Sequence, residues 1–173
     1  LSATSATFGN IGGANTVSGN NSIAIGQNNT SSGHESMTLG TRNTASGTRS
    51  FAMGYQSTAT GNNSFATGYE SNASVNNSFA MGYQTTATGY YTTTMGSNTT
   101  AHNYSSVSIG QYNNLNFSAP AGVSNSNIVF NKHNMAFVIG NGLDSNNKSD
   151  AFAVRFDGAT DVFGTLDVSG NTD

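Results

Sequence analysis

A glycine recurs every fourteen residues through the first two thirds of this 173-residue chain, eight times and with no insertion. Large apolar residues stand one and three positions before most of these glycines, a serine stands four before, and an alanine five after. A unit of fourteen residues is too short for a helix pair or a propeller blade, so it predicts a stack of similar coils. The repeat glycines are Gly12, Gly26, Gly40, Gly54, Gly68, Gly82, Gly96 and Gly110.

Each coil has room for two short strands and two turns. The clearest copy is Ser50–Gly54 followed by Thr58–Gly61. Its alternation places Phe51 and Met53 on one face of a strand and Ala52 on the other. Glycine at the end of the strand supplies the positive φ of a corner. We therefore predict an all-β fold for residues 1–117, a parallel β-solenoid flattened into a roll, in which eight coils span about 40 Å.

The core of such a roll is expected to be thin, because most repeats offer two large apolar residues and one or two alanines. Burial at about 25 cal/mol per Å2 barely offsets the cost of ordering the backbone, which is roughly 1–2 kcal/mol per residue. Identical neighbouring chains are therefore expected to supply the missing burial. This argument leaves the number of chains open.

Composition excludes several classes of protein. Gly, Ser, Thr and Asn make up 92 of the 173 residues, charged residues are 8%, and the net charge is −3. Such a chain is a poor helical domain, a poor nucleic-acid binder, and contains no apolar run that would insert in a membrane. Its 17 aromatic residues and single proline argue against disorder. The absence of cysteine removes disulfides and thiolate chemistry.

The motif Asn-Ser-x-Ala-x-Gly, with alanine and glycine again five and seven residues later, closely resembles the head repeat of trimeric autotransporter adhesins, the YadA-like head. Matching stretches are residues 21–26, 63–68 and 77–82, and the resemblance covers about residues 5–117. It implies a left-handed parallel β-roll, a homotrimer around one axis, and a role in surface attachment. The same repeat occurs in tail fibres of phages and contractile injection systems. Phe and Met replace many of the usual small aliphatic residues here.

Residues 118–173 differ from the repeat and carry six of the eight acidic residues. Strand-length apolar runs separated by turn signals stand at 127–130, 136–140, 151–156 and 160–170. The pattern is similar, more loosely, to fibre modules of phages and injection systems. We predict a small β-rich connector for this second part of the chain.

Tyrosines are the strongest candidates for a binding surface. Tyr55, Tyr69 and Tyr83 directly follow the repeat glycine in three successive coils, so they should stack about 5 Å apart. Tyrosine offers rigid amphipathic area, which suits contact with a glycan or protein receptor. The alternative is a ladder that only stiffens a corner or a chain interface. The predicted strip consists of Tyr55, Tyr69, Tyr83, Tyr90, Tyr91 and Tyr104.

No catalytic residue, metal site or cofactor is predicted. His34, His102 and His133 are isolated in the sequence, and a ring of one histidine from each of three chains is the only way they could share a metal. Glu35 and Glu70 stand at different coil positions and form no carboxylate pair. The polar run 144–150 lacks the spacing and central glycine of a calcium loop.

The sequence therefore favours a non-enzymatic, extracellular fibre or adhesin head that displays a receptor-binding surface on a cell, a phage or an injection-system particle. One alternative is a structural shaft whose binding tip lies elsewhere. Another is an ice-binding solenoid, because threonine and serine flank the position five after each glycine in a regular array.

Overall fold

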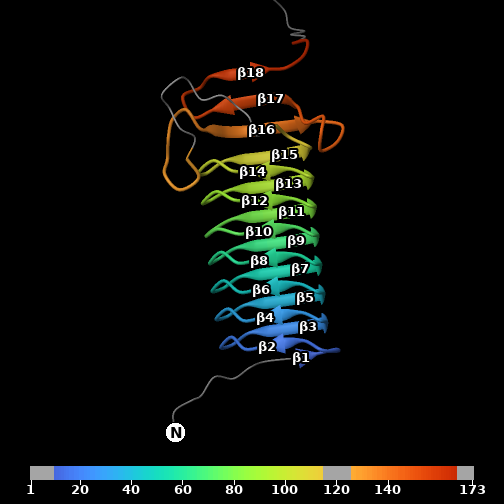
Figure 1. Cartoon of the computed structure of the whole chain (residues 1–173). Coiled ribbons are helices and arrows are strands. Elements are labelled where there is room, and N and C mark those ends of the chain that lie inside the picture. The colour runs from blue at the N-terminus through green and yellow to red at the C-terminus, as the bar shows by residue number, and fades with distance from the viewer. Residues whose placement is uncertain (1–9, 115–125, 167–173) are drawn as a thin grey trace, which may run out of the picture.

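The computed structural model describes residues 10–114 and 126–166, which form strands, turns and loops. Figure 1 shows two sheets running along one rod, in which the chain crosses from one to the other in every coil. The first sheet has eleven strands in the order β1-β3-β5-β7-β9-β11-β13-β15-β16-β17-β18. The second sheet has seven short strands in the order β14-β12-β10-β8-β6-β4-β2. Among these residues no helix is long and apolar enough to cross a membrane.

The repeat produces one long and one short strand in each coil. The long strands are β1 (Asn10–Ile11), β3 (Ile23–Gln27), β5 (Met37–Thr41), β7 (Phe51–Tyr55), β9 (Phe65–Tyr69), β11 (Phe79–Tyr83), β13 (Thr93–Ser97) and β15 (Val107–Gln111). The short strands are β2 (Thr16–Val17), β4 (Thr30–Ser31), β6 (Thr44–Ala45), β8 (Thr58–Ala59), β10 (Asn72–Ala73), β12 (Thr86–Ala87) and β14 (Thr100–Ala101). All of them pair in parallel with a register of one repeat, such as Gly54 with Gly68. The predicted parallel β-solenoid with fourteen-residue coils is confirmed.

The repeat glycine is required for two independent reasons. Its φ is positive in every coil, for example 108° at Gly54 and 122° at Gly68, a region that side chains rarely tolerate. A Cβ on Gly54 would also collide with the carbonyl oxygen of Gly68 in the next coil. The corner therefore admits neither a side chain nor another conformation.

Alanine fills the interior between the two sheets. A continuous column of fully buried alanines alternates between long and short strands: Ala45, Ala52, Ala59, Ala66, Ala73, Ala80 and Ala87. The expectation that large apolar residues share this core was wrong. Phe51 and Met53 lie on one face of β7 and Ala52 on the other, as predicted, but Ala52 is the residue that points inward. In the coils outside this column the inward position of the long strand also carries a small side chain, such as Thr38, Thr94 or Ser108.

Buried hydrogen bonds hold the corners and connect the coils beside the alanine column. Before most long strands stands a serine, or Thr92, whose hydroxyl donates to the carbonyl three residues earlier, as Ser50 Oγ does to Gly47 O at 2.7 Å. Three residues after the repeat glycine, Asn29 and Asn43 are also buried and form an amide ladder, with Asn43 Nδ2 donating to Asn29 Oδ1 at 3.2 Å. The sequence analysis missed this ladder, although its regular spacing was a usable signal.

The C-terminal part extends the same sheet. After a longer excursion, β16 (Met135–Asn141) pairs in parallel with β15, and Gly140 lies opposite Gly110. The strands β17 (Asp150–Arg155) and β18 (Thr160–Val162) then add in antiparallel order. The chain therefore ends its stack of coils with a meander.

The expected strands at 136–140 and 151–156 are confirmed, whereas a strand at 127–130 was wrong. That segment lies along a corner of the roll instead, where Ser126 and Asn127 carbonyls accept hydrogen bonds from turn N–H groups. Of the run 160–170 only Thr160–Val162 is a strand, and positions 167–170 lie outside the described residues. The boundary at 117/118 also lies outside them and stays a prediction.

Candidate binding surfaces

The six candidate tyrosines form two groups, not one strip. Tyr55, Tyr69 and Tyr83 end the long strands β7, β9 and β11. Tyr91 stands two residues before β13 begins, and Tyr104 three residues before β15. The two groups therefore lie at opposite edges of the eleven-stranded sheet, as the strand directions in Figure 1 show.

The first group is a stack of three rings, which we call the tyrosine column. The ring centroids of Tyr55 and Tyr69 are 5.1 Å apart with planes at 16°, and those of Tyr69 and Tyr83 are 5.1 Å apart at 10°. Tyr69 is 40% exposed and Tyr83 47%. Because neighbouring rings cover one another's faces, the column presents ring edges and hydroxyl groups along its length.

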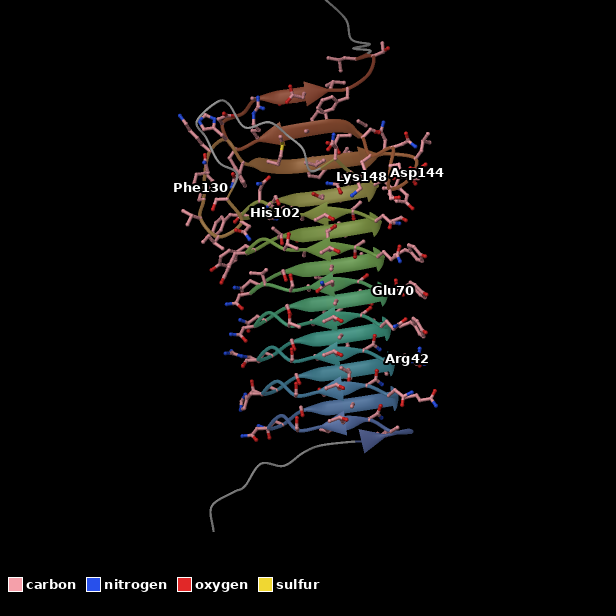
Figure 2. The ribbon with its side chains drawn as sticks, viewed as in Figure 1. Arg42, Glu70, His102, Phe130, Asp144 and Lys148 are labelled. Carbon is pink, nitrogen blue, oxygen red and sulfur yellow. The ribbon has the colours of Figure 1, made fainter. Side chains whose placement is uncertain are left out.

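A second column of polar side chains stands one residue beyond the tyrosines. Arg42 Nη1 donates to the hydroxyl of Tyr55 at 3.2 Å, and Gln84 Nε2 donates to Glu70 Oε2 at 2.7 Å. Figure 2 shows Arg42 and Glu70 at the edge of the roll where the long strands end. The negative charge of Glu70 raises the pKa of Tyr69 above its ordinary value.

The second tyrosine group meets the segment that runs along the corner. Backbone N–H groups of Tyr90 and Tyr104 donate to Asn127 O at 2.9 Å and Ser126 O at 2.8 Å. The rings meet at steep angles, 46° between Tyr90 and Tyr91 and 66° between Tyr91 and Tyr104. Tyr91 and three residues of the segment are each more than half exposed; the three are Ile128, Val129 and Phe130. Sequence reasoning missed this patch because it assigned 127–130 to a strand.

The outward face of the long strands is apolar. Phe51, Phe65 and Phe79 stack with centroids 5.1 Å and 4.9 Å apart. The position two residues later continues the face, and there Met81 is 40% exposed. In a single chain this whole face, which we call the phenylalanine face, is only half-buried although it carries the largest apolar side chains of the repeat.

The short strands present hydroxyl groups instead. Thr16, Thr30, Thr44 and Thr58 lie in register in successive coils. Asn72 interrupts this row of threonines one coil later. The array is therefore regular over only part of the roll.

The histidines stay apart from one another. His34 is half-exposed, and its Nδ1 lies 3.7 Å from Glu35. His102 Nδ1 lies 3.0 Å from the hydroxyl of Thr88. His133 Nδ1 lies 2.8 Å from Asp157 Oδ2. No group of three metal-ligating side chains occurs within residues 10–114 and 126–166.

Three carboxyl groups within residues 126–166 accept hydrogen bonds from nearby groups, those of Asp144, Asp150 and Asp157. Asp144 accepts hydrogen bonds from the side-chain amide of Asn147 and from the backbone N–H groups of Asn146 and Asn147, and these bonds lower the pKa of its carboxyl group. A backbone N–H from Ala159 and the contact with His133 lower the pKa of Asp157. Burial raises the pKa of Asp150. The run 144–150 forms a loop in which Asp144 is turned toward its own backbone, an arrangement typical of a tight hairpin.

Comparison with known proteins agrees with this geometry. The family model described as the YadA head domain repeat, in two copies, matches residues 11–29, 31–57, 45–71, 59–85 and 73–99. The last four matches overlap and begin fourteen residues apart, which is the spacing of the coils, and the five matches together cover just over half of the chain. No curated protein matches the chain as a relative.

Proposed function

The chain belongs to the family of YadA head domain repeats, and from this premise we propose that it is the trimeric head of a surface fibre that attaches its carrier to a cell. Heads of this family are in general trimeric, surface-exposed and extracellular, and their fold suggests a structural role without catalysis. In this proposal, residues 1–117 form the head, and residues 118–173 connect it to the next part of the fibre.

The exposed phenylalanine face is the main support for a trimer. Small side chains fill the interior of the roll, so the rings of Phe51, Phe65 and Phe79 lie outside it, where they stack only on one another and stay half-exposed. A continuous half-exposed apolar face of this length is typical of an interface. Every coil carries this apolar face on the same side of the roll. Three copies around one axis therefore bring the same residues of the three chains together in every layer of coils.

Attachment in this proposal comes from many weak contacts. The repeat region carries only two acidic and two basic residues, so long-range electrostatic steering contributes little to encounter. Short-range contacts of aromatic rings and hydroxyl groups remain, and the two tyrosine groups are the densest surfaces of that kind. Three chains present each of them three times, which raises avidity without any new contact.

Removal of whole coils can distinguish an adhesive head from a purely structural shaft. Removal of residues 56–83 deletes two coils with Tyr69 and Tyr83 and rejoins the chain in phase. Removal of residues 14–41 deletes two coils that contain no tyrosine and shortens the rod equally. Both variants are compared in the full-length parent protein for attachment of its carrier to the surface that it normally colonises.

The proposal expects attachment to fall by about tenfold or more, roughly 1.4 kcal/mol, when the tyrosine coils are removed and to change little when the control coils are removed. Equal attachment by both shortened proteins would favour the shaft and contradict the adhesive role. A mass measurement on each variant shows whether its assembly is intact.

A further inference from the structure

We propose that the tyrosine column binds a linear β-1,4-linked hexose chain that lies along the axis of the roll. This inference rests on the proposed function, because it names the class of surface component to which the head attaches. Its site is formed by Tyr55, Tyr69 and Tyr83 together with the polar side chains beside them.

The first argument is the repeat distance. The three phenol rings are spaced 5.1 Å apart, because each belongs to a neighbouring strand of one parallel sheet. An extended β-1,4-linked hexose chain advances by nearly the same distance per sugar, since its linking oxygens lie at opposite ends of each chair. An extended peptide advances by about 3.4 Å per residue and falls out of step with the column at once. A straight hexose chain can therefore place one sugar at each coil.

The second argument is the chemistry that repeats with the rings. Each tyrosine carries a hydroxyl that both donates and accepts hydrogen bonds, which suits the hydroxyl groups of a sugar. The adjoining corner adds one polar side chain in each of three successive coils: Gln56, Glu70 and Gln84. Their φ angles of 52°, 50° and 52° hold these residues in the same conformation in successive coils. The column and its corner therefore offer a tyrosine hydroxyl and one polar corner side chain at each coil, a glutamate at the middle coil and a glutamine at the other two.

The third argument is the end of the column. In the next coil Ser97 lies opposite Tyr83, so a small hydroxyl residue follows the last ring of the stack. Tyr83 is accordingly the most exposed of the column's tyrosines, at 47%. Its outer ring face is where the apolar face of a terminal sugar would stack.

The charge of the site favours a neutral sugar chain. Arg42 lies at one end of the column and Glu70 in its middle, so no excess of either sign is present. The second tyrosine group provides a matched control, because its rings meet at 46° and 66° and have no regular repeat. Tyr91 is 52% exposed and can be changed in the same way as a column residue.

The experiment titrates the 173-residue protein with cellohexaose, with the α-1,4-linked maltohexaose as the mismatched probe. The chain contains no tryptophan, and three of its seven tyrosines belong to the column, so a change in tyrosine emission can be followed on binding. We expect cellohexaose to bind at least about tenfold more tightly than maltohexaose, and cellotriose to bind nearly as well as cellohexaose because three rings accept three sugars. Equal binding of the two hexamers, or binding of neither, would overturn the proposal.

Three substitutions locate the site. Tyr69→Ser should weaken cellohexaose binding by about tenfold or more, whereas Tyr91→Ser should leave it unchanged. Tyr69→Phe keeps the ring stack and removes one hydroxyl, so it should weaken binding by about fivefold, the worth of one hydrogen bond. Unchanged binding in Tyr69→Phe and Tyr69→Ser contradicts the assignment, and so does a loss of the native mass in Tyr69→Phe.

The two proposals fail in different ways. If neither hexamer binds but removal of residues 56–83 still weakens attachment more than removal of 14–41, the head is adhesive and the hexose assignment is wrong. If both excisions act equally, the adhesive function itself is contradicted.

Discussion

Replacement of Asn43 by alanine tests how the coils are held together. Asn43 is fully buried, and its Nδ2 donates to Asn29 Oδ1 at 3.2 Å, Leu39 O at 3.0 Å and Gly54 O at 2.8 Å. Its Oδ1 accepts from the backbone N–H of Ser57 at 2.9 Å. One side chain thus links its own coil to the coils on both sides.

Asn43→Ala removes all of these side-chain contacts, which amount to three full hydrogen bonds because the Nδ2 group carries only two protons. At a net contribution of about 1 kcal/mol each, the free energy of unfolding should fall by about 3 kcal/mol. The whole free energy of unfolding of a typical domain is about 5–15 kcal/mol, so this loss should be easily measured. Asn43→Ser should cost less by about 1 kcal/mol, because Ser57 holds the same place one coil later and still donates to Gly68 O at 3.2 Å.

The assay is urea unfolding followed by circular dichroism at one fixed chain concentration. Thr44→Ala serves as the neighbouring control, because the side chain of Thr44 points outward, and it should cost less than about 1 kcal/mol. If Asn43→Ala stays within about 1 kcal/mol of the wild type, or matches Thr44→Ala, the amide ladder does not stabilise the roll as argued.

Three further predictions concern backbone, charge and ice. Gly68→Ala should abolish folding of the central coils, seen as loss of the strand signal in circular dichroism, because the new Cβ meets the Gly82 carbonyl at a φ of 122°. The pKa of Asp157 is lowered in the folded chain, so this carboxylate stabilises the fold at pH values above its ordinary pKa, and the stabilisation is lost as the pH falls through its folded-state pKa. Asp157→Asn should therefore reduce the acid-induced drop in urea midpoint. Thermal hysteresis should be absent at micromolar protein, because Asn72 interrupts the threonine array.

Much of the fold followed from periodicity alone. The fourteen-residue glycine spacing predicted the coil, and the alternation in Phe51–Met53 predicted the two faces of a long strand. Alternation cannot decide which face points inward, because that depends on the distance between the sheets. Here Ala52 is the buried residue of the long strand, opposite buried alanines of the short strands, and the larger Phe51 and Met53 lie outside.

The candidate site was predicted in part for a similar reason. The stacking of Tyr55, Tyr69 and Tyr83 followed from their identical position in successive coils. Tyr91 was grouped with them because it lies close in sequence, yet half a coil carries the chain to the opposite edge of the sheet. The path of 126–130 along the corner depends on hydrogen bonds to turn N–H groups, which no pattern in an apolar run reveals.

The mass of the protein in solution tests the central claim most directly, namely that the phenylalanine face joins three chains. Sedimentation or light scattering at low micromolar concentration should give about three times the chain mass of 17.8 kDa. Phe65→Ser should shift this equilibrium toward smaller species, because it replaces the middle ring of the stacked face with a polar residue. A well-folded particle of 17.8 kDa from the unchanged chain would contradict the account.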